Sequence, residues 1–276
     1  MELLPARDPR LTKSMPTAEL RESFLLEELF QTDTVRLVYS ENDRAIVGAT
    51  VPVKAELSLP APKEMAASFF AERREIGVLN VGGPGRISVD KSAFDLANRD
   101  LLYIGRGAKE IVFSSEKAAE PAAFFLLSFP AHHSHPTTMM RFADAEAVAL
   151  GSPEAANQRT IYKYIHPGGI QSCQLVMGFT QLKSGSIWNT MPPHTHARRM
   201  EVYLYFDMPE NARVFHFMGQ PEETRHLVIA NRQVVISPSW SIHCGAGTGA
   251  YAFCWGMGGE NQAFEDMDAV RMEQLR

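Results

Sequence analysis

The sequence predicts an all-β protein that consists of two barrels of similar size, with a few short helices. Short runs rich in β-branched and aromatic residues recur along residues 34–142 and again along 168–260, and turn residues such as Gly82 to Gly85 separate them. Long helical segments do not alternate with these runs, which argues against a parallel α/β sheet. Each half has about the length of a small barrel or jelly roll, so the rhythm of strands indicates a duplication.

The first predicted element is a helix over residues 16–30, because Pro16 and Thr17 suit a helix start and apolar residues follow on one face. The strands predicted in the first half cover residues 34–40, 44–53, 75–83, 101–105, 110–115 and 123–129. We therefore divide this part of the chain into an N-terminal helical segment, residues 1–33, and a first barrel, residues 34–150.

The second half begins with a stretch, residues 152–165, that is predicted to be partly helical because Ser152 suits the N-cap. The strands predicted after it cover residues 170–182, 200–208, 212–219, 224–230, 233–238 and 249–258. The last residues, 268–276, are predicted to form a short helix. Residues 151–276 are therefore assigned to a second barrel with a C-terminal helix.

Composition places the chain among ordinary soluble proteins, with 276 residues, 45% of them hydrophobic and 21% charged. A formal net charge of -5 argues against nucleic acid or an anionic membrane as the main partner. The longest apolar run, residues 121–131, is too short to span a membrane, and the first residues contain no apolar signal core. Cys173, Cys244 and Cys254 have no CxxC spacing, which favours reduced thiols in a cytoplasmic protein.

Two histidines, His194 and His196, stand just before an apolar strand. Residues i and i+2 of a strand share a face, so the two imidazoles can reach one ion. Glu201 lies five residues after His196, an odd offset that places it on the opposite face of a regular strand. A bulge or bend within residues 197–200 would bring the carboxylate back toward the histidines.

His243 follows Pro238 and a turn far downstream, and completes a recognisable pattern. HxHx₄E on one strand pair and PxGxxH on another are the signature of the cupin barrel, a double-stranded β-helix or jelly roll. Trp240 stands where that motif usually has glycine. A bare HxH is equally compatible with two surface imidazoles, but the four residues together predict a metal site in a duplicated cupin. Three imidazoles and a carboxylate suit a divalent first-row ion with open coordination positions, and they do not select the ion.

The first half contains no HxH, so its barrel is predicted to be metal-free and structural. A second histidine-rich stretch contains His132, His133 and His135, without a nearby carboxylate. This stretch either lines a pocket or links the two halves.

Longer stretches carry a more specific resemblance. The segments NVGGPGRISVD, RTIYKYIHPGGIQSCQLVMGFTQL, MPPHTHARRMEVYLYFD and SPSWSIHCGAGT resemble the 5-keto-4-deoxyuronate isomerase family, whose members are also called 4-deoxy-L-threo-5-hexosulose-uronate ketol-isomerases. The resemblance extends from about residue 20 to the last residue. Ala197 departs from it, because many relatives have an acidic residue beside the second histidine.

The resemblance implies a two-cupin subunit, a hexameric homo-oligomer and a cytoplasmic role in the breakdown of pectin and other uronate polysaccharides. It also implies one Zn²⁺ per subunit on His194, His196, Glu201 and His243. The implied reaction converts 5-dehydro-4-deoxy-D-glucuronate to 3-deoxy-D-glycero-2,5-hexodiulosonate by moving the carbonyl from C1 to C2. A divalent ion that binds O1 and O2 would stabilise an enediolate, and a metal-assisted hydride shift gives the same product.

Several residues are candidates for the proton transfer and for binding the anionic keto-uronate. Glu201, Lys163 and Tyr205 are candidate proton carriers, and His166 is a candidate for proton transfer or substrate binding. The substrate carboxylate suits a bidentate arginine, for which the candidates are, in order, Arg199, Arg198 and Arg141. The alternative for each arginine is a solvated surface position.

Two other functions fit a cupin with these ligands. One is a dioxygenase or oxidase that uses iron, manganese or copper, and the other is a non-catalytic sugar-binding cupin. The long shared stretches outside the predicted metal site favour the isomerase.

Overall fold

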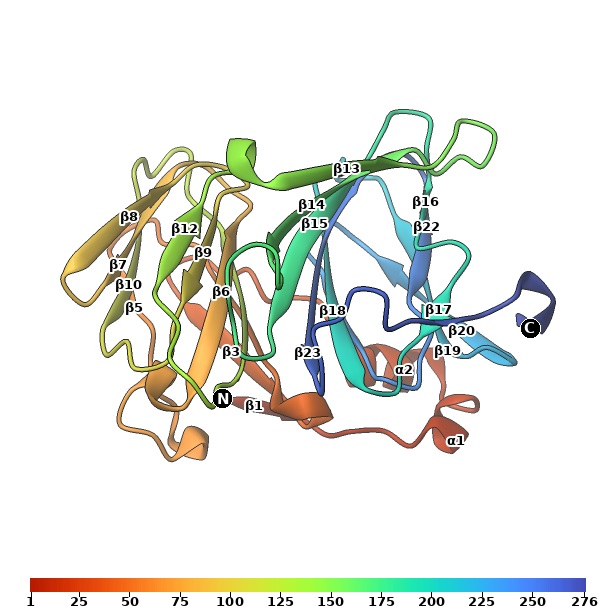
Figure 1. The fold of residues 1–276 in the computed structure, drawn as a ribbon, viewed down its shortest axis with the longest axis horizontal. Coiled ribbons are helices and arrows are strands. Elements are labelled where there is room, and N and C mark those ends of the chain that lie inside the picture. Colours follow the sequence, from red (N-terminus) through yellow and green to blue (C-terminus); the bar gives the residue numbers. More distant parts are fainter. The chain divides into compact units, whose positions relative to one another are not determined.

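The computed structural model describes residues 1–276, which form mainly β-strands with a few short helices (Figure 1). The all-β class predicted from the sequence is confirmed. The chain forms two compact units. Unit 1 contains residues 1–4, 28–146 and 164–177, and unit 2 contains residues 5–27, 147–163 and 178–276.

Both units are discontinuous in sequence, which differs from the contiguous division predicted at residues 33 and 150. The reason is strand pairing between distant segments. In unit 2, β2 (Leu25–Leu26) pairs with β21 (Val234–Ser237), more than two hundred residues later in the chain. Local hydrophobic patterns identify strands but not their partners.

Unit 1 is a barrel of two antiparallel-rich sheets. Its seven-stranded sheet contains, in spatial order, β1 (Glu2–Leu4), β3 (Val35–Ser40), β4 (Ile46–Thr50), β11 (Phe124–Pro130), β6 (Arg74–Asn80), β9 (Leu101–Ile104) and β12 (Thr138–Met140). Its four-stranded sheet contains β5 (Leu57–Ser58), β10 (Ile111–Ser115), β7 (Gly85–Val89) and β8 (Ser92–Leu96). Four 3₁₀ turns lie on its connections: η1 (Asn42–Arg44), η2 (Lys63–Met65), η3 (Phe70–Glu72) and η4 (Phe142–Asp144).

A second pair of sheets repeats this arrangement and lies mainly in unit 2. The seven-stranded sheet contains β13 (Glu146–Leu150), β14 (Arg159–Ile165), β15 (Val176–Leu182), β23 (Ala252–Gly259), β18 (Arg199–Phe206), β21 and β2. The four-stranded sheet contains β16 (Trp188–Asn189), β22 (Cys244–Gly247), β19 (Val214–Gln220) and β20 (Glu223–Ile229), and β17 (His194–Thr195) pairs separately with β24 (Asp268–Ala269). The matching sheet orders confirm the predicted duplication.

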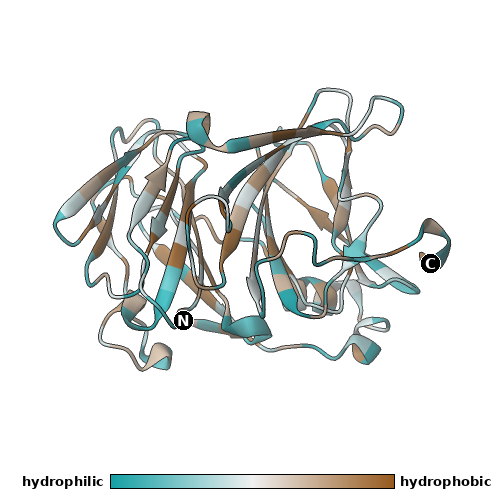
Figure 2. Cartoon of the chain, viewed as in Figure 1, coloured by the Kyte–Doolittle hydropathy of each residue, from teal (hydrophilic) through white to brown (hydrophobic).

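The interiors of the two barrels differ in polarity. A large cluster of buried apolar side chains, among them Ile76, Ile87 and Phe113, lies inside unit 1. In unit 2 the alternate residues Glu201, Tyr203 and Tyr205 of β18 are buried beside histidines, so one face of this strand is polar. Figure 2 shows hydrophobic residues along the strands and hydrophilic residues on many of the connecting loops.

Three predicted elements differ from the structure. The helix predicted over residues 16–30 is only α2 (Thr17–Phe24), after a single-turn α1 (Pro9–Thr12), because the next two residues form β2. Residues 152–158 form turns rather than a helix start, and the strand predicted from residue 170 begins at Val176.

The predicted C-terminal helix is also wrong. Residues 268–276 form β24 and the 3₁₀ turn η5 (Met272–Gln274) instead. Val270 is buried against Ile242 and Cys244, with Leu275 packed on the same cluster, so this tail buries its apolar residues in an extended conformation. The three cysteines are free, and no helix has both the length and the apolar composition needed to cross a membrane.

Gly178 on β15 allows a close approach between neighbouring strands. A Cβ atom at this position would lie 2.5 Å from the ring of Trp255 on β23, and closer still to the carbonyl oxygen of Tyr162. We therefore expect Gly178→Ala to lower the free energy of unfolding by about 2 kcal/mol, through overpacking. Urea denaturation measures this change.

Gly249→Ala is the matched control, because a Cβ atom there meets nothing within 4 Å. Equal stabilities of the two variants would contradict the close packing of Trp255 against β15.

Candidate metal centre and its cavity

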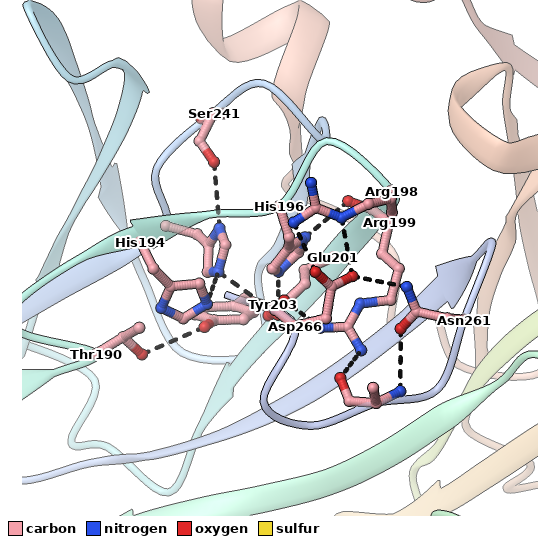
Figure 3. Close-up of polar contacts among 12 residues, drawn as sticks. Thr190, His194, His196, Arg198, Arg199, Glu201, Tyr203, Ser241, Asn261 and Asp266 are labelled. Atoms are coloured by element: carbon pink, nitrogen blue, oxygen red, sulfur yellow. Dashed lines mark hydrogen bonds and ion pairs between the residues drawn. The ribbon is translucent and has the colours of Figure 1, made fainter. Parts of the chain in front are cut away.

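The four residues predicted as metal ligands lie together in unit 2. Their ligand atoms, one from each of His194, His196, Glu201 and His243, all lie within 4.8 Å of one another. Figure 3 shows His194, His196 and Glu201 pointing toward one another from the segment that contains β17 and β18. His196, Glu201 and His243 are buried and His194 is partly buried, so the cluster lies below the protein surface.

A tight turn brings Glu201 to the histidines, in the segment where a bulge or bend was predicted. The amide of Arg199 donates to the carbonyl of His196 at 3.2 Å, and the turn separates β17 from β18. The strand register therefore restarts after the turn. His196 and Glu201 face each other although their spacing in sequence is odd, and His196 Nε2 lies 2.9 Å from Glu201 Oε1.

Backbone carbonyls orient two of the imidazoles. His196 Nδ1 lies 2.8 Å from the carbonyl oxygen of Arg199, and His243 Nδ1 lies 3.3 Å from that of Ser241. Since a carbonyl oxygen only accepts hydrogen bonds, each Nδ1 carries the proton and donates it. Both Nε2 atoms are then directed into the cluster, which is the arrangement that orients metal-ligating histidines in proteins.

The spacing of the ligand atoms suits a small divalent ion. His243 Nε2 lies 3.0 Å from His194 Nε2 and 3.5 Å from Glu201 Oε1. Zinc–ligand bonds of about 2.0–2.1 Å in a tetrahedron place neighbouring ligand atoms about 3.3 Å apart. The four side chains therefore need only small shifts to hold such an ion.

Burial and mutual charge set the protonation of the cluster. Burial, with the neighbouring His243, lowers the pKa of His194 to about 3, and burial lowers the pKa of His243 to about 4. Burial alone would raise the pKa of Glu201, but the three imidazoles hold it below its usual range. At neutral pH the cluster therefore contains a carboxylate and at least two neutral imidazoles, the protonation states that metal binding needs.

His196 differs from the other two imidazoles. Burial disfavours its charged form, but the hydrogen bond to Glu201, the charge of Glu201 and the hydrogen bond to the Arg199 carbonyl together outweigh burial and raise the pKa of His196. This shift describes the cluster without an ion, in which a proton on Nε2 bridges the imidazole and the carboxylate. An ion bound to both groups would replace that proton.

A cavity of about 290 Å³ lies against the cluster, within unit 2. This volume is at the small end of the range for small-molecule sites. The polar side chains at its wall are Arg159, Thr180, Thr190, His194, Arg199, Glu201 and Tyr203. The remaining wall is largely apolar and contains Leu150, Ile161, Met191, Pro192, Phe253, Trp255, Met257, Phe264 and Met267. The cavity thus combines a few polar groups with an apolar wall that excludes water.

The two arginines after the histidines hold a loop of the cavity wall. Arg199 is 1% exposed, and its two Nη atoms donate to the carbonyls of Ala263 and Asp266 at 2.7 and 2.9 Å. Arg198 forms ion pairs with the carboxylates of Asp266 and Asp268. Phe264 and Met267, which line the cavity, belong to this loop. Arg199 lines the cavity, while Arg198 does not.

The structure does not bring Lys163 or Tyr205 into the cavity wall. The Lys163 ammonium lies 5.1 Å from the ring centre of Phe264. Tyr205 is fully buried, and its hydroxyl lies 2.8 Å from Nδ1 of His216. His216 is itself buried, and burial lowers the pKa of His216 to about 3.

Two further residues that were predicted to bind the substrate, Arg141 and His166, lie in unit 1. Arg141 Nη1 is 3.7 Å from Asp100, and His166 Nε2 is 3.5 Å from Glu146. The second histidine-rich stretch also lies in unit 1, where the rings of His133 and His135 are 5.0 Å apart. None of these residues lines the cavity of unit 2.

Sequence reasoning missed several residues of the cavity wall, and two of them, Tyr203 and Arg159, are ionisable. Tyr203 lies two residues after Glu201 on the same face of β18, and its hydroxyl is 3.3 Å from Thr190 Oγ1. Burial, together with the charge of Glu201, raises the pKa of Tyr203 well above its ordinary value. Strand parity places this residue on the same face as Glu201, although it does not separate Tyr203 from Tyr205. Arg159 is the first residue of β14 and lies two residues before Ile161, so both side chains are on the same face of the strand, and both line the cavity. This alternation was the only signal in the sequence that could have placed Arg159.

Comparisons with known proteins agree on family and fold. The model of the KduI/IolB family matches residues 24–274. Proteins named 4-deoxy-L-threo-5-hexosulose-uronate ketol-isomerase are similar over nearly the whole chain: that of Lachnoclostridium phytofermentans is 55% identical over 100% of both chains, and that of Shouchella clausii is 51% identical over 97% of both. The crystal structure of an IolB-like protein from Salmonella typhimurium aligns with a TM-score of 0.71 at 14% identity, over 90% of this chain and 96% of that one, which shows a shared fold.

The buried His216 gives the free energy of unfolding a dependence on pH. The unfolded histidine titrates near pH 6.5, whereas the folded one stays neutral to about pH 3, so the unfolded state binds more protons below pH 6.5. Stability therefore falls as the pH falls. Between pH 6.5 and 4, we expect the free energy of unfolding of the metal-free wild type to fall by about 3 kcal/mol more than that of His216→Gln.

Urea denaturation at each pH measures this difference, and His226→Gln, an exposed histidine on β20, is the matched control. A His216→Gln variant whose stability falls as steeply as that of the wild type would contradict a neutral, buried His216.

Proposed function

The chain belongs to the KduI/IolB family, and we propose on that basis that it is a 4-deoxy-L-threo-5-hexosulose-uronate ketol-isomerase. It would convert 5-dehydro-4-deoxy-D-glucuronate to 3-deoxy-D-glycero-2,5-hexodiulosonate. Relatives with that name are 51–55% identical to it over nearly their whole length, which supports the substrate. The observation in the structure that carries the proposal is the convergence of His194, His196, Glu201 and His243 beside a cavity suited to a small molecule, with His194 and Glu201 in its wall.

The donor set supports a single Zn²⁺ per subunit. Three imidazoles and one carboxylate, with two Nε2 atoms oriented by carbonyls, are ligands that zinc prefers. A bound Zn²⁺ would act as a Lewis acid that stabilises negative charge on O1 and O2 of the substrate. The reaction needs no redox change, which favours zinc over the redox-active metals of cupin oxygenases.

Tyr203 is proposed to interact with the oxygens of the substrate. Isomerisation removes a proton from C2 and returns one to C1, through an enediolate whose oxygens need hydrogen-bond donors. Because the pKa of Tyr203 is raised, its hydroxyl stays protonated and acts as a donor rather than as a base. Its position at the cavity wall, two residues from Glu201, supports this role.

Glu201 stays a candidate for the base that takes the C2 proton. Its carboxylate is at the cavity wall, but the surrounding imidazoles hold its pKa low and so weaken it as a base. Lys163 and Tyr205 have less support, because neither lines the cavity. The apolar wall, with Phe253, Trp255 and Met257, would keep water from protonating the enediolate at the wrong atom.

Location and assembly belong to the same proposal. The three free cysteines support a reducing compartment, the cytoplasm. We also propose that the protein forms the homo-hexamer that the sequence resemblance implies. Light scattering of the purified protein tests this assembly.

His243→Ala removes one ligand of the proposed zinc site. We expect the metal content, measured by mass spectrometry of the purified protein, to fall from one ion per chain to a small fraction. Isomerase turnover should fall more than about 100-fold, because even changes outside a metal's own ligands cost 10–100-fold. His226→Ala, exposed on β20, is the control and should keep both metal and activity. Full turnover by metal-free His243→Ala would refute the proposed mechanism.

Tyr203→Phe removes the proposed donor while the ring stays in place. We expect kcat to fall about 100-fold or more with the metal content unchanged, as for loss of one oxyanion donor. Tyr205→Phe is the matched control on the same strand face. It should lose about 1 kcal/mol of stability with its bond to His216 but keep kcat. A Tyr203→Phe enzyme with wild-type kcat would exclude the hydroxyl from the reaction.

A further inference from the structure

The cavity contains two guanidinium groups, and they differ in how far the protein already uses them. Arg199 donates through both Nη atoms to the loop carbonyls of Ala263 and Asp266, and Nε is its one nitrogen without a partner. Arg159 donates a single hydrogen bond, from Nη1 to the carbonyl of Asn157 at 2.9 Å. Most of the donors of Arg159 are therefore available to a ligand.

Arg159 also lacks a counter-ion. It is half-buried on β14, and the ionisable groups that influence it are Tyr203 and Tyr251 rather than a carboxylate. Burial lowers the pKa of Arg159, which still leaves the guanidinium charged at neutral pH. A partly desolvated cation without an anionic partner costs free energy, and an anionic ligand in the cavity would remove that cost.

Arg159 is placed in the sheet where it can reach the end of a six-carbon acid that is distant from the histidine cluster. In the seven-stranded sheet β14 is three strand positions from β18, which carries Glu201, because β15 and β23 lie between them. Three strand spacings correspond to about 14 Å along the sheet, and the curvature of a barrel shortens this distance. An open chain held at one end by the histidine cluster and at the other by a long arginine side chain can span the gap.

We propose that Arg159 binds the C6 carboxylate of the substrate through its guanidinium fork and makes the site selective for uronates over neutral sugars. This inference rests on the proposed function for the identity of the substrate. It assigns the carboxylate to Arg159 instead of Arg199, Arg198 or Arg141, the candidates from the sequence. Arg199 and Arg198 hold the loop of residues 261–268, and Arg141 belongs to unit 1.

Binding of stable sugar acids tests the anion site without any turnover. D-Glucuronate and its neutral analogue D-glucuronamide are titrated into the zinc-loaded protein, and calorimetry gives the Kd of each. We expect the wild type to prefer the acid at least tenfold and Arg159→Gln to lose that preference, since a charge-assisted bidentate pair is lost. Arg159→Lys, which keeps the charge but not the fork, should fall between them.

Arg213→Gln is the matched control, because Arg213 is exposed and donates to its own loop carbonyls. Thermal unfolding of each variant establishes that it is folded. A wild type without preference for the acid, or an Arg159→Gln variant that keeps the preference, would overturn the inference and return the assignment to Arg199.

Steady-state kinetics with the keto-uronate separate this inference from the proposed function. We expect Arg159→Gln to raise KM at least tenfold while kcat changes less, because the carboxylate is not a reacting group. If the wild type prefers glucuronate but does not turn over the keto-uronate, the proposed function fails and the anion site stands. If the wild type is active and Arg159→Gln has an unchanged KM, the function stands and the anion site fails.

Discussion

The turn from His196 to Arg199 is the constraint on which the site depends. The amide of Arg199 closes the turn on the carbonyl of His196, and its own carbonyl accepts the Nδ1 proton of that histidine. Its side chain holds the loop that contains Phe264 and Met267. One residue therefore sets the register of Glu201, the tautomer of His196 and a wall of the cavity. Substitutions at Arg199 should affect all three together. A change in substrate affinity in such a variant would therefore not show that Arg199 itself binds the substrate.

The two barrels show what the same sheet architecture can contain. Unit 1 is filled by apolar side chains such as Ile76 and Phe113, which stabilise it by burial. Unit 2 places Glu201, Tyr203 and His216 in equivalent surroundings, where each needs a partner because a buried polar group without one is costly. His196 Nε2, Thr190 Oγ1 and the hydroxyl of Tyr205 supply these partners in turn. Polarity thus accumulates in the barrel that contains the cavity.

The sequence predicted the all-β class, most strands and the four-residue cluster, because strand periodicity and the HxHx₄E spacing are local patterns. It selected Tyr205 where the cavity has Tyr203, since both share a face of β18 and only packing decides which one a cavity reaches. It named Arg199 and not Arg159, although both line the cavity, because Arg199 is close to the histidines in sequence and Arg159 is not. The tail after residue 268 was predicted as a helix, since burial of Val270 depends on contacts with Ile242 that no local pattern records.

The central claim is that the histidine cluster and its cavity carry out ketol isomerisation of a keto-uronate. The most direct measurement incubates the purified, zinc-loaded protein with 5-dehydro-4-deoxy-D-glucuronate in deuterated buffer and follows C1 by NMR, while an electrode records dissolved oxygen. We expect the C1 aldehyde signal to disappear, a C1 hydroxymethyl signal to replace it and the oxygen concentration to stay constant. An unchanged aldehyde, or oxygen uptake in proportion to substrate loss, would contradict the central claim.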